Sequence, residues 1–396
     1  MKIDVFNEIQ DPRPWQEGHQ HARITEALAQ ARLADELGYG CWWQVEHHGA
    51  EEFSLSSAPE LMLAAISQQT SRIRLGHAAV LAPARFNHPI RAAERAAMLD
   101  HLSGGRLEFG LTRSTAPEWR LFGVDPADVR RQTQQAFEMI PRMWTSERFS
   151  HSSEDFEIRD VPIVPKPLQQ PHPPLWQAAA SPASFEEAGR RGVGVLGTTI
   201  WESVERVRRM VGLYRAAAEA CTSPVGSQVN NQVAFFTFVH CAETDEQAIR
   251  NGAVAAAAWY TVKALTFFEA ADSFVETVRR QEELLNDPSG GGLTGEFLRA
   301  EAAGSTGPNR AQVVIGRVLQ GDDVEPEEIF EALNEQDSLI VGSPETCRKK
   351  LRVYADLGID RLMAFHQVGS LKHEDVMRSL RLIGDLIPEF DEPTRP

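Results

Sequence analysis

Short apolar runs alternate along this chain with longer segments in which apolar residues recur at helical spacing. A short apolar run bounded by polar or turn residues is typical of a buried strand, whereas apolar residues three and four positions apart mark one face of a helix. The pattern predicts strands near Lys2–Phe6, Cys41–Val45, Ile73–Leu81, Leu107–Leu111, Leu175–Ala179, Val193–Gly197, Val233–Val239 and Arg361–Phe365.

Helical segments are predicted between these strands. In the first of them Ile24, Leu28, Ala31 and Ala34 share one face, and Gly38 stands where the helix would end. Further helix starts are marked by a proline, at the position where its missing N–H costs least: Pro59, Pro89, Pro126 and Pro182.

Strand–helix units of this kind close in one of two ways, as a doubly wound open sheet or as an eight-stranded barrel. Periodicity alone does not separate the two. The number of predicted strands and the lack of a glycine-rich dinucleotide turn after the first strand favour an α/β fold of the (β/α)8, or TIM barrel, type. Reactive groups in such a barrel gather at the carboxyl ends of the strands, so candidate chemistry is sought there.

We expect one domain over residues 1–396, with two stretches that interrupt the strand–helix rhythm. Residues from about 147 to 174 are rich in proline and polar side chains, which predicts an insertion that crosses the rim. Residues from about 286 to 320 contain glycine-rich clusters. That composition suits either a mobile lid between the last two barrel strands or a disordered surface loop.

The net charge of the chain limits the classes of binding partner that we expect. The chain has 40 Lys and Arg against 56 Asp and Glu, a net charge of −16. Nucleic acid or an anionic membrane would require a basic face, so neither is expected as the main partner. No apolar run reaches the ~18 residues of a membrane helix, and no signal-peptide pattern is present. The four cysteines are widely spaced without a CxxC pair, which favours a reducing cytoplasm.

Candidate chemistry begins at the end of the second predicted strand, where Glu46, His47 and His48 follow one another. Histidine exchanges protons near neutral pH, so one interpretation is a general base or a hydrogen-bond donor to a bound cofactor. A second is a metal site, although adjacent residues on an extended chain point to opposite sides and are poorly placed to chelate one ion. The third interpretation is a solvated loop.

Two other strand ends carry groups suited to an anion. Arg113 follows the fourth strand, where an arginine can either bind a phosphate through two parallel hydrogen bonds or form a surface ion pair. Ser181 and Ser184 follow the fifth strand at a helix start, whose exposed N–H groups favour an anion, although a simple serine N-cap explains Ser181 as well. Together these residues suggest one phosphate-bearing cofactor. His366, just past the eighth strand, is a further candidate for a site.

An ordered set of short segments makes the chain recognisable. It resembles the bacterial luciferase-like flavin monooxygenases, and within them the alkanal monooxygenase α-chain branch. No single segment is decisive, and the specificity lies in their order over nearly the whole chain. The segments are Glu46-His47-His48, Leu102-Ser103-Gly104-Gly105-Arg106 with Phe109-Gly110, Thr112-Arg113, Phe122-Gly123-Val124-Asp125, Ala180-Ser181 with Ser184, and Val341-Gly342-Ser343-Pro344-Glu345.

This resemblance implies a TIM barrel that binds reduced FMN (FMNH2) and uses O2 as co-substrate. It implies action on an apolar small molecule through a flavin C4a-(hydro)peroxide, a separate flavin reductase, and a homodimer. The catalytic residues would be His47 and His48. Arg113 and the two serines would contact the FMN phosphate, and Ala78–Ala79 would form a cis peptide beneath the flavin ring. The full set of implied cofactor-binding residues is Glu46, Ala78, Ala79, Thr112, Arg113, Ala180, Ser181 and Ser184.

The chain departs from luciferase α-chains at positions that bear on the reaction. Those chains have Cys, Glu and Trp where this one has Thr112, Ala180 and Thr199, and Gly49 replaces the Phe that follows the histidine pair. Light emission and a long-chain aldehyde substrate are therefore not implied. Three other functions stay open: a deazaflavin (F420)-dependent oxidoreductase on the same barrel, a metal-dependent TIM-barrel hydrolase, and a non-catalytic partner subunit.

Overall fold

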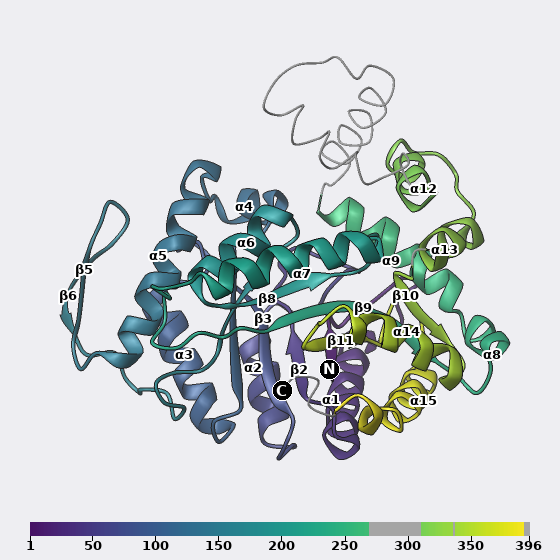
Figure 1. Cartoon of the computed structure of the whole chain (residues 1–396), viewed down its shortest axis with the longest axis horizontal. Helices are drawn as coiled ribbons and strands as arrows, with labels where there is room; N and C mark the ends of the chain where they lie inside the picture. The colour runs from purple at the N-terminus through teal and green to yellow at the C-terminus, as the bar shows by residue number, and fades with distance from the viewer. Residues whose placement is uncertain (269–309, 336, 392–396) are drawn as a thin grey trace.

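The chain folds into a closed barrel of eight parallel strands with helices between them, a (β/α)8 or TIM barrel (Figure 1). This computed structural model describes residues 1–268, 310–335 and 337–391. All the predicted strands are confirmed as the strands of the barrel. In their order around the wall these are β1 (Lys2–Asn7), β2 (Cys41–Gln44), β3 (Arg74–Leu81), β4 (Leu107–Thr112), β7 (Leu175–Ala178), β8 (Gly194–Thr198), β9 (Val233–Cys241) and β11 (Arg361–Phe365).

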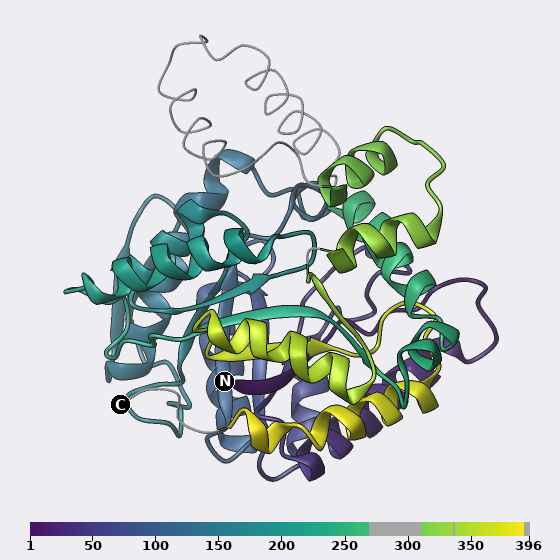
Figure 2. The same ribbon diagram turned by 45° about the vertical axis from the view of Figure 1, so that its right-hand side comes forward.

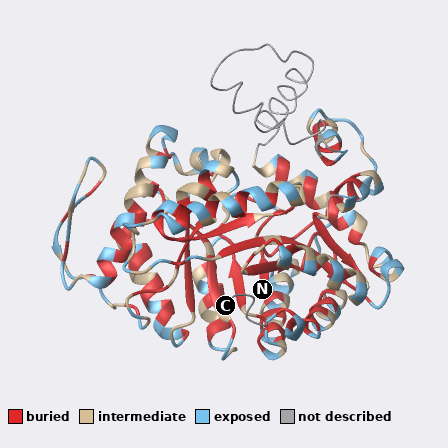
Figure 3. Cartoon of the chain, in the orientation of Figure 1, coloured by how far each residue is buried: buried red, intermediate tan, exposed pale blue. Residues whose placement is uncertain are grey.

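Helices cover the outside of the barrel, and they bury one side while exposing the other (Figure 3). Each of the four prolines named above begins a helix, and Gly38 ends the first helix with a φ of 88°. The helices are α1 (His19–Leu37), α2 (Pro59–Ser67), α3 (Pro89–Leu102), α4 (Ala116–Phe122), α5 (Pro126–Thr145), α6 (Pro182–Arg191), α7 (Val204–Glu219), α8 (Asp245–Arg250), α9 (Ala253–Phe267), α12 (Arg310–Leu319), α13 (Pro326–Glu335), α14 (Pro344–Asp356), α15 (His373–Gly384) and the 3-10 helix η1 (Ile387–Glu389).

Three further strands lie outside the barrel wall. β5 (Phe149–Ser152) and β6 (Glu157–Val161) form an antiparallel hairpin within the expected insertion, and the hairpin projects away from the barrel beside α5 (Figure 1). β10 (Leu339–Gly342) pairs with the second half of β9, whose first half pairs with β8. The sequence pattern did not predict these strands.

The proposed lid falls mostly outside the described residues. Of residues 286–320, only those from 310 onward are described, and they form α12. α12 packs on α13, and both contact α9 at one side of the barrel (Figure 2). In the described ranges, no helix combines the length and the apolar character that crossing a membrane requires.

The amino-terminal end of the barrel interior contains buried charges. Arg361 on β11 donates to both carboxylate oxygens of Asp4 on β1, at 2.9 and 2.8 Å. The Trp43 indole N–H donates to Asp4 at 2.8 Å, and that of Trp176 donates to Glu108 at 2.6 Å. Buried charges are tolerated when they are paired and hydrogen-bonded. The Asp4–Arg361 pair meets this condition and joins the first barrel strand to the last.

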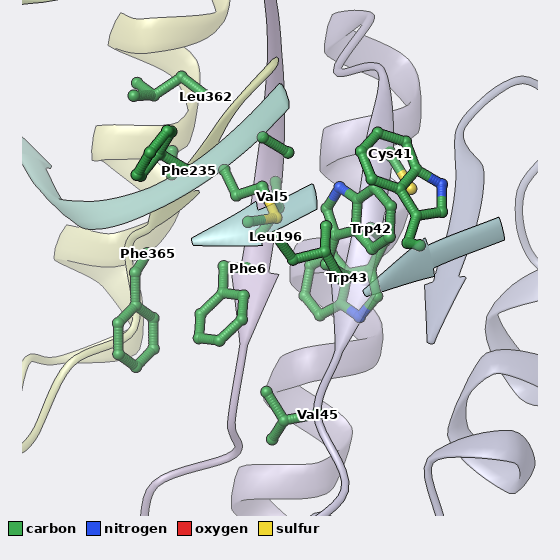
Figure 4. Packing of buried hydrophobic residues seen from close by; sticks show 14 of the residues in the cluster. Val5, Phe6, Cys41, Trp42, Trp43, Val45, Leu196, Phe235, Leu362 and Phe365 are labelled. Atoms are coloured by element: carbon green, nitrogen blue, oxygen red, sulfur yellow. The ribbon is translucent and has the colours of Figure 1, made fainter. Parts of the chain in front are cut away.

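An aromatic layer lies above these charges. Side chains alternate between the two faces of a strand, so Phe6 follows Asp4 on the inner side of β1. The Phe6 ring stacks on Phe236 with centroids 4.2 Å apart. It also meets the Phe365 ring at 5.4 Å, and Figure 4 shows these two side chains beside each other. This layer separates the charged end of the barrel from its carboxyl-terminal mouth.

Candidate active site

Glu46 holds the ends of two neighbouring strands together at the barrel mouth. Its carboxylate is buried and accepts hydrogen bonds from Asn87 Nδ2 at 2.9 Å, from the Leu81 N–H at 3.2 Å and from His48 Nε2 at 3.3 Å. Burial alone would raise the pKa of Glu46, but hydrogen bonds from His48 and its other partners hold that pKa below its ordinary range. The hydrogen bond to Glu46 raises the pKa of His48.

The two histidines contact different groups, as their adjacent positions predicted. The rings nearest His47 are Phe53 at 5.7 Å, Phe267 at 5.1 Å and Phe268 at 5.8 Å. The His48 ring instead lies 4.9 Å from Phe122 and 6.4 Å from Phe86, two rings that also contact each other. Throughout the part of the chain that the structure describes, no three His, Cys, Asp or Glu side chains form a group that could hold a metal ion.

A buried carboxylate that sequence analysis did not single out faces His47. Glu118, on α4, places Oε1 3.3 Å from His47 Nδ1 and accepts the His48 backbone N–H at 3.0 Å. Its Oε2 accepts the hydroxyls of Ser114 at 2.6 Å and Thr115 at 3.2 Å. The spacing of Thr115 and Glu118 is a capping-box signature, which marks a helix start and gives no hint of the histidines.

Arg113 is exposed beyond the end of β4, and its guanidinium has no hydrogen bond or ion pair among the described residues. It lines a cavity together with Thr112, Arg130, Glu187 and Arg191. Glu187 lies 3.0 Å from Arg191 and 3.8 Å from Arg130. Burial lowers the pKa of Arg191, and the positive charges of Arg130 and Arg113 lower it further. Three cations around one carboxylate leave this cavity with an excess of positive charge, which suits an anion.

Ser181 and Ser184 begin α6 as a reciprocal cap. Ser181 Oγ accepts the Ser184 N–H at 3.3 Å, and Ser184 Oγ accepts the Ser181 N–H at 3.0 Å. The N-cap interpretation of Ser181 is therefore confirmed. Ala180 and Ser181 are exposed, whereas Ser184 is buried. The cavity that Arg113 lines runs along later turns of α6, and within the described residues no hydrogen bond joins Arg113 to either serine.

The peptide bond between Ala78 and Ala79 is cis, as the resemblance implied. It lies within β3, where the pairing with β4 shifts register between His77 and Val80. A Cβ at Gly110 on β4 would lie 2.5 Å from the His77 carbonyl oxygen and 3.0 Å from Ala79 Cβ. Only glycine allows the two backbones to approach this closely.

His366, a candidate for a site by its place after the last barrel strand, is a core residue in the structure. His366 is only 1% exposed, with Nδ1 2.9 Å from Ser379 Oγ on α15 and Nε2 3.3 Å from the Tyr39 hydroxyl. Burial lowers its pKa to about 3. It is therefore a neutral core histidine that follows β11 and hydrogen-bonds with Tyr39, just after α1, and with Ser379 on α15.

The barrel mouth beside His47 is aromatic and contains a further buried acid, Glu8. The Tyr260 ring lies 5.8 Å from Phe53 and 5.4 Å from Phe365. Its hydroxyl hydrogen-bonds with Glu8, which is 2% exposed. Glu8 lies just beyond the end of β1 and continues the alternation of Asp4 and Phe6, a signal that could have identified it from sequence.

This fold and these groups define a TIM barrel whose chemistry lies at the carboxyl ends of its strands. Residues 7–361 match the family described as luciferase-like monooxygenase, and the chain belongs to this family.

Curated relatives match part of the chain. The oxygenase component of the flavin-dependent trigonelline monooxygenase of Acinetobacter baylyi is 34% identical over 49% of this chain and 54% of its own length. Limonene 1,2-monooxygenase of Rhodococcus erythropolis is 29% identical over 60% of this chain and 62% of its own length. The chain thus spans little more than half the length of these relatives.

Solved structures match over nearly the whole chain. Monooxygenase RslO1 from Streptomyces bottropensis superposes with a TM-score of 0.72 at 25% identity, covering 98% of this chain and 100% of that one. The oxygenating constituent of 3,6-diketocamphane monooxygenase from Pseudomonas putida, solved with FMN, has a TM-score of 0.71 at 18% identity and covers 99% of both chains. The second match supports the fold alone.

Proposed function

We propose that this chain is the oxygenase of a two-component flavin-dependent monooxygenase, which uses reduced FMN and O2 to oxygenate an apolar small molecule. The observation that carries the proposal is the guanidinium of Arg113, which the described residues leave without a hydrogen bond or ion pair and which lines a positively charged cavity at the same edge of the barrel as His47. Family membership supports the same reaction class.

The donor set at this edge fits a flavin phosphate. Arg113 and Arg130 supply charge-assisted hydrogen bonds, which are stronger than neutral ones. Ser181 and Ser184 stand at the start of α6, where the helix dipole favours an anion. Glu46, Ala78, Ala79, Thr112 and Ala180 complete the proposed cofactor site. Arg130 is an addition to the residues predicted from sequence.

The other residues of the barrel mouth have two proposed roles, which are to exclude water from the site and to transfer a proton. Reduced FMN, when bound, supplies the electrons that activate O2. The aromatic rings around His47 exclude water and favour an apolar substrate. His47 moves the proton that the reaction requires, and His48, hydrogen-bonded to Glu46, holds the turn in place.

Two partners follow from the proposal. A separate reductase supplies the flavin, in keeping with a relative named as an oxygenase component. A second copy of this chain covers apolar side chains that α2 and α3 leave exposed: Leu61 at 70%, Met98 at 51% and Leu102 at 46%.

Anaerobic titration with reduced FMN tests the proposal. Arg113→Ala should weaken binding by on the order of 10–100-fold, since one charge-assisted contact is lost. Arg159→Ala, on the exposed β5–β6 hairpin, is the matched control and should bind as the unmodified chain does. Equal affinity of the two variants for reduced FMN would contradict the assignment of Arg113 to the FMN phosphate. If reduced FMN drives no O2 uptake while reduced F420 is oxidised by an added acceptor, the deazaflavin-dependent alternative replaces the proposal.

A further inference from the structure

The Glu118 carboxylate is fully enclosed where α4 folds back over the end of β2. Its side chain has 0% exposure, against 14% for His47. Ser114, which precedes α4, has a φ of 66°, so the chain reverses sharply after β4 and brings the helix to the histidine turn. The reversal places three donors around one carboxylate, the His48 backbone N–H and the hydroxyls of Ser114 and Thr115, and brings His47 Nδ1 within 3.3 Å of the same group.

The hydrogen bonds around Glu118 stabilise the ionised form of its carboxylate. Burial alone would raise its pKa, but the hydrogen bonds and the nearby His47 lower it below the ordinary value. An ionised carboxylate only accepts hydrogen bonds. The His47 nitrogen that faces it must therefore carry a proton.

On the other side of the His47 ring, the described residues supply no hydrogen bond or ion pair to Nε2. The aromatic rings of the described residues that lie beside it are those of Phe53, Phe267 and Phe268. With the proton at Nδ1, neutral imidazole leaves the Nε2 lone pair facing this apolar space.

We infer that Glu118 is a positioning residue, which holds His47 in the Nδ1–H tautomer and so presents Nε2 as the atom that exchanges a proton with the reactants. Glu118 touches neither substrate nor cofactor in this assignment and acts only through His47. The tautomer is a property of the protein alone, whereas its use in turnover rests on the proposed function.

Nitrogen-15 NMR of the chain labelled at histidine, recorded without flavin, tests the tautomer. The His47 signals are assigned by their loss in His47→Gln. The unmodified chain should show a protonated Nδ1 and an unprotonated Nε2. Glu118→Leu removes the acceptor, so a large share of the proton should move to Nε2, and Glu118→Gln, whose amide oxygen still accepts, should restore Nδ1–H in part. Asp125→Asn, at the N-cap of α5, is the control and should leave the His47 signals unchanged.

Two results would overturn the inference: an Nε2–H tautomer in the unmodified chain, or an unaltered His47 spectrum in Glu118→Leu. If Glu118→Leu does not fold, as judged by circular dichroism, Glu118→Ala, which also lacks an acceptor, takes its place, and the tautomer of the unmodified chain still decides: an Nε2–H form overturns the inference.

An activity measurement separates this inference from the function. Glu118→Leu should lower oxygenated product formation by on the order of 10²-fold, while its affinity for reduced FMN stays within about twofold of the unmodified chain. Full product yield in Glu118→Leu contradicts the positioning role. No product from the unmodified chain refutes the proposed function, and the NMR result then decides the tautomer alone.

Discussion

Replacing Glu8 by glutamine should make the stability of this protein much less sensitive to pH as the pH rises from the ordinary carboxyl pKa of 4.5 to the folded-state pKa of about 8. Glu8 lies just beyond β1, is 2% exposed, and accepts a hydrogen bond from Gln10 Nε2 at 2.7 Å. Burial raises the pKa of this carboxyl to about 8, from an ordinary value of 4.5. Glutamine has nearly the same shape as the neutral acid and does not titrate, so the variant isolates the effect of the proton.

The magnitude follows from proton linkage. Below the unfolded-state pKa the carboxyl is protonated in both states, and its contribution to stability is fully present. As pH rises toward the folded-state pKa, the unfolded chain releases a proton that the folded chain retains, so stability is lost. The loss is roughly 1.4 kcal/mol for each pH unit, or about 5 kcal/mol over the whole interval. Above the folded-state pKa the loss is constant.

Urea unfolding followed by tryptophan fluorescence, from about pH 5 to about pH 9, measures this difference. The unfolding free energy of Glu8→Gln should rise relative to that of the unmodified chain as pH increases. Glu219→Gln, at the exposed end of α7, is the control and should follow the unmodified chain throughout. A gap between Glu8→Gln and the unmodified chain that is the same at both ends of the pH range would refute the reasoning.

Three further predictions concern the mouth and the core. His47→Ala should bind reduced FMN normally yet lose on the order of 10²-fold in product formation, measured by chromatography, because the proton-transfer group is gone; an undiminished yield would count against its role. Arg361→Met should lower the free energy of unfolding by about 3–5 kcal/mol, since it leaves the Asp4 carboxylate buried without its partner; a loss near zero in urea titration would show that the pair is dispensable. Gly76→Ala should cost at least about 1–3 kcal/mol and lower the Tm, because its Cβ would overlap the Trp43 ring; an unchanged Tm would mean that the ring moves aside freely.

Much of the barrel could be predicted from sequence because its determinants are local. A buried parallel strand is a continuous apolar run, and a helix that starts at proline and ends at glycine carries both signals in the chain itself. The rule that parallel strands present their carboxyl ends at one edge then placed His47 and Arg113 at the same mouth.

The features that were missed depend on contacts distant in sequence. Glu118 and His47 are 71 residues apart in sequence, and only the packing of α4 over the end of β2 brings the two together. β5 and β6 are short and mostly exposed, so their composition does not differ from that of a loop. His366 has the same chemistry as a site histidine, and only the packing of α1 and α15 makes it a core residue.

The Asp4–Arg361 pair also bears on how this protein folds. Its partners are separated by 357 residues, and they lie on the two strands whose pairing closes the barrel. Contacts between such distant segments form late, because a long loop must be ordered before they can be made. During synthesis, the edge of β1 that pairs with β11 therefore keeps its backbone N–H and C=O groups without strand partners until β11 has been synthesised. Cellular chaperones that shield this edge should affect the yield of folded protein more than those that act on the helices.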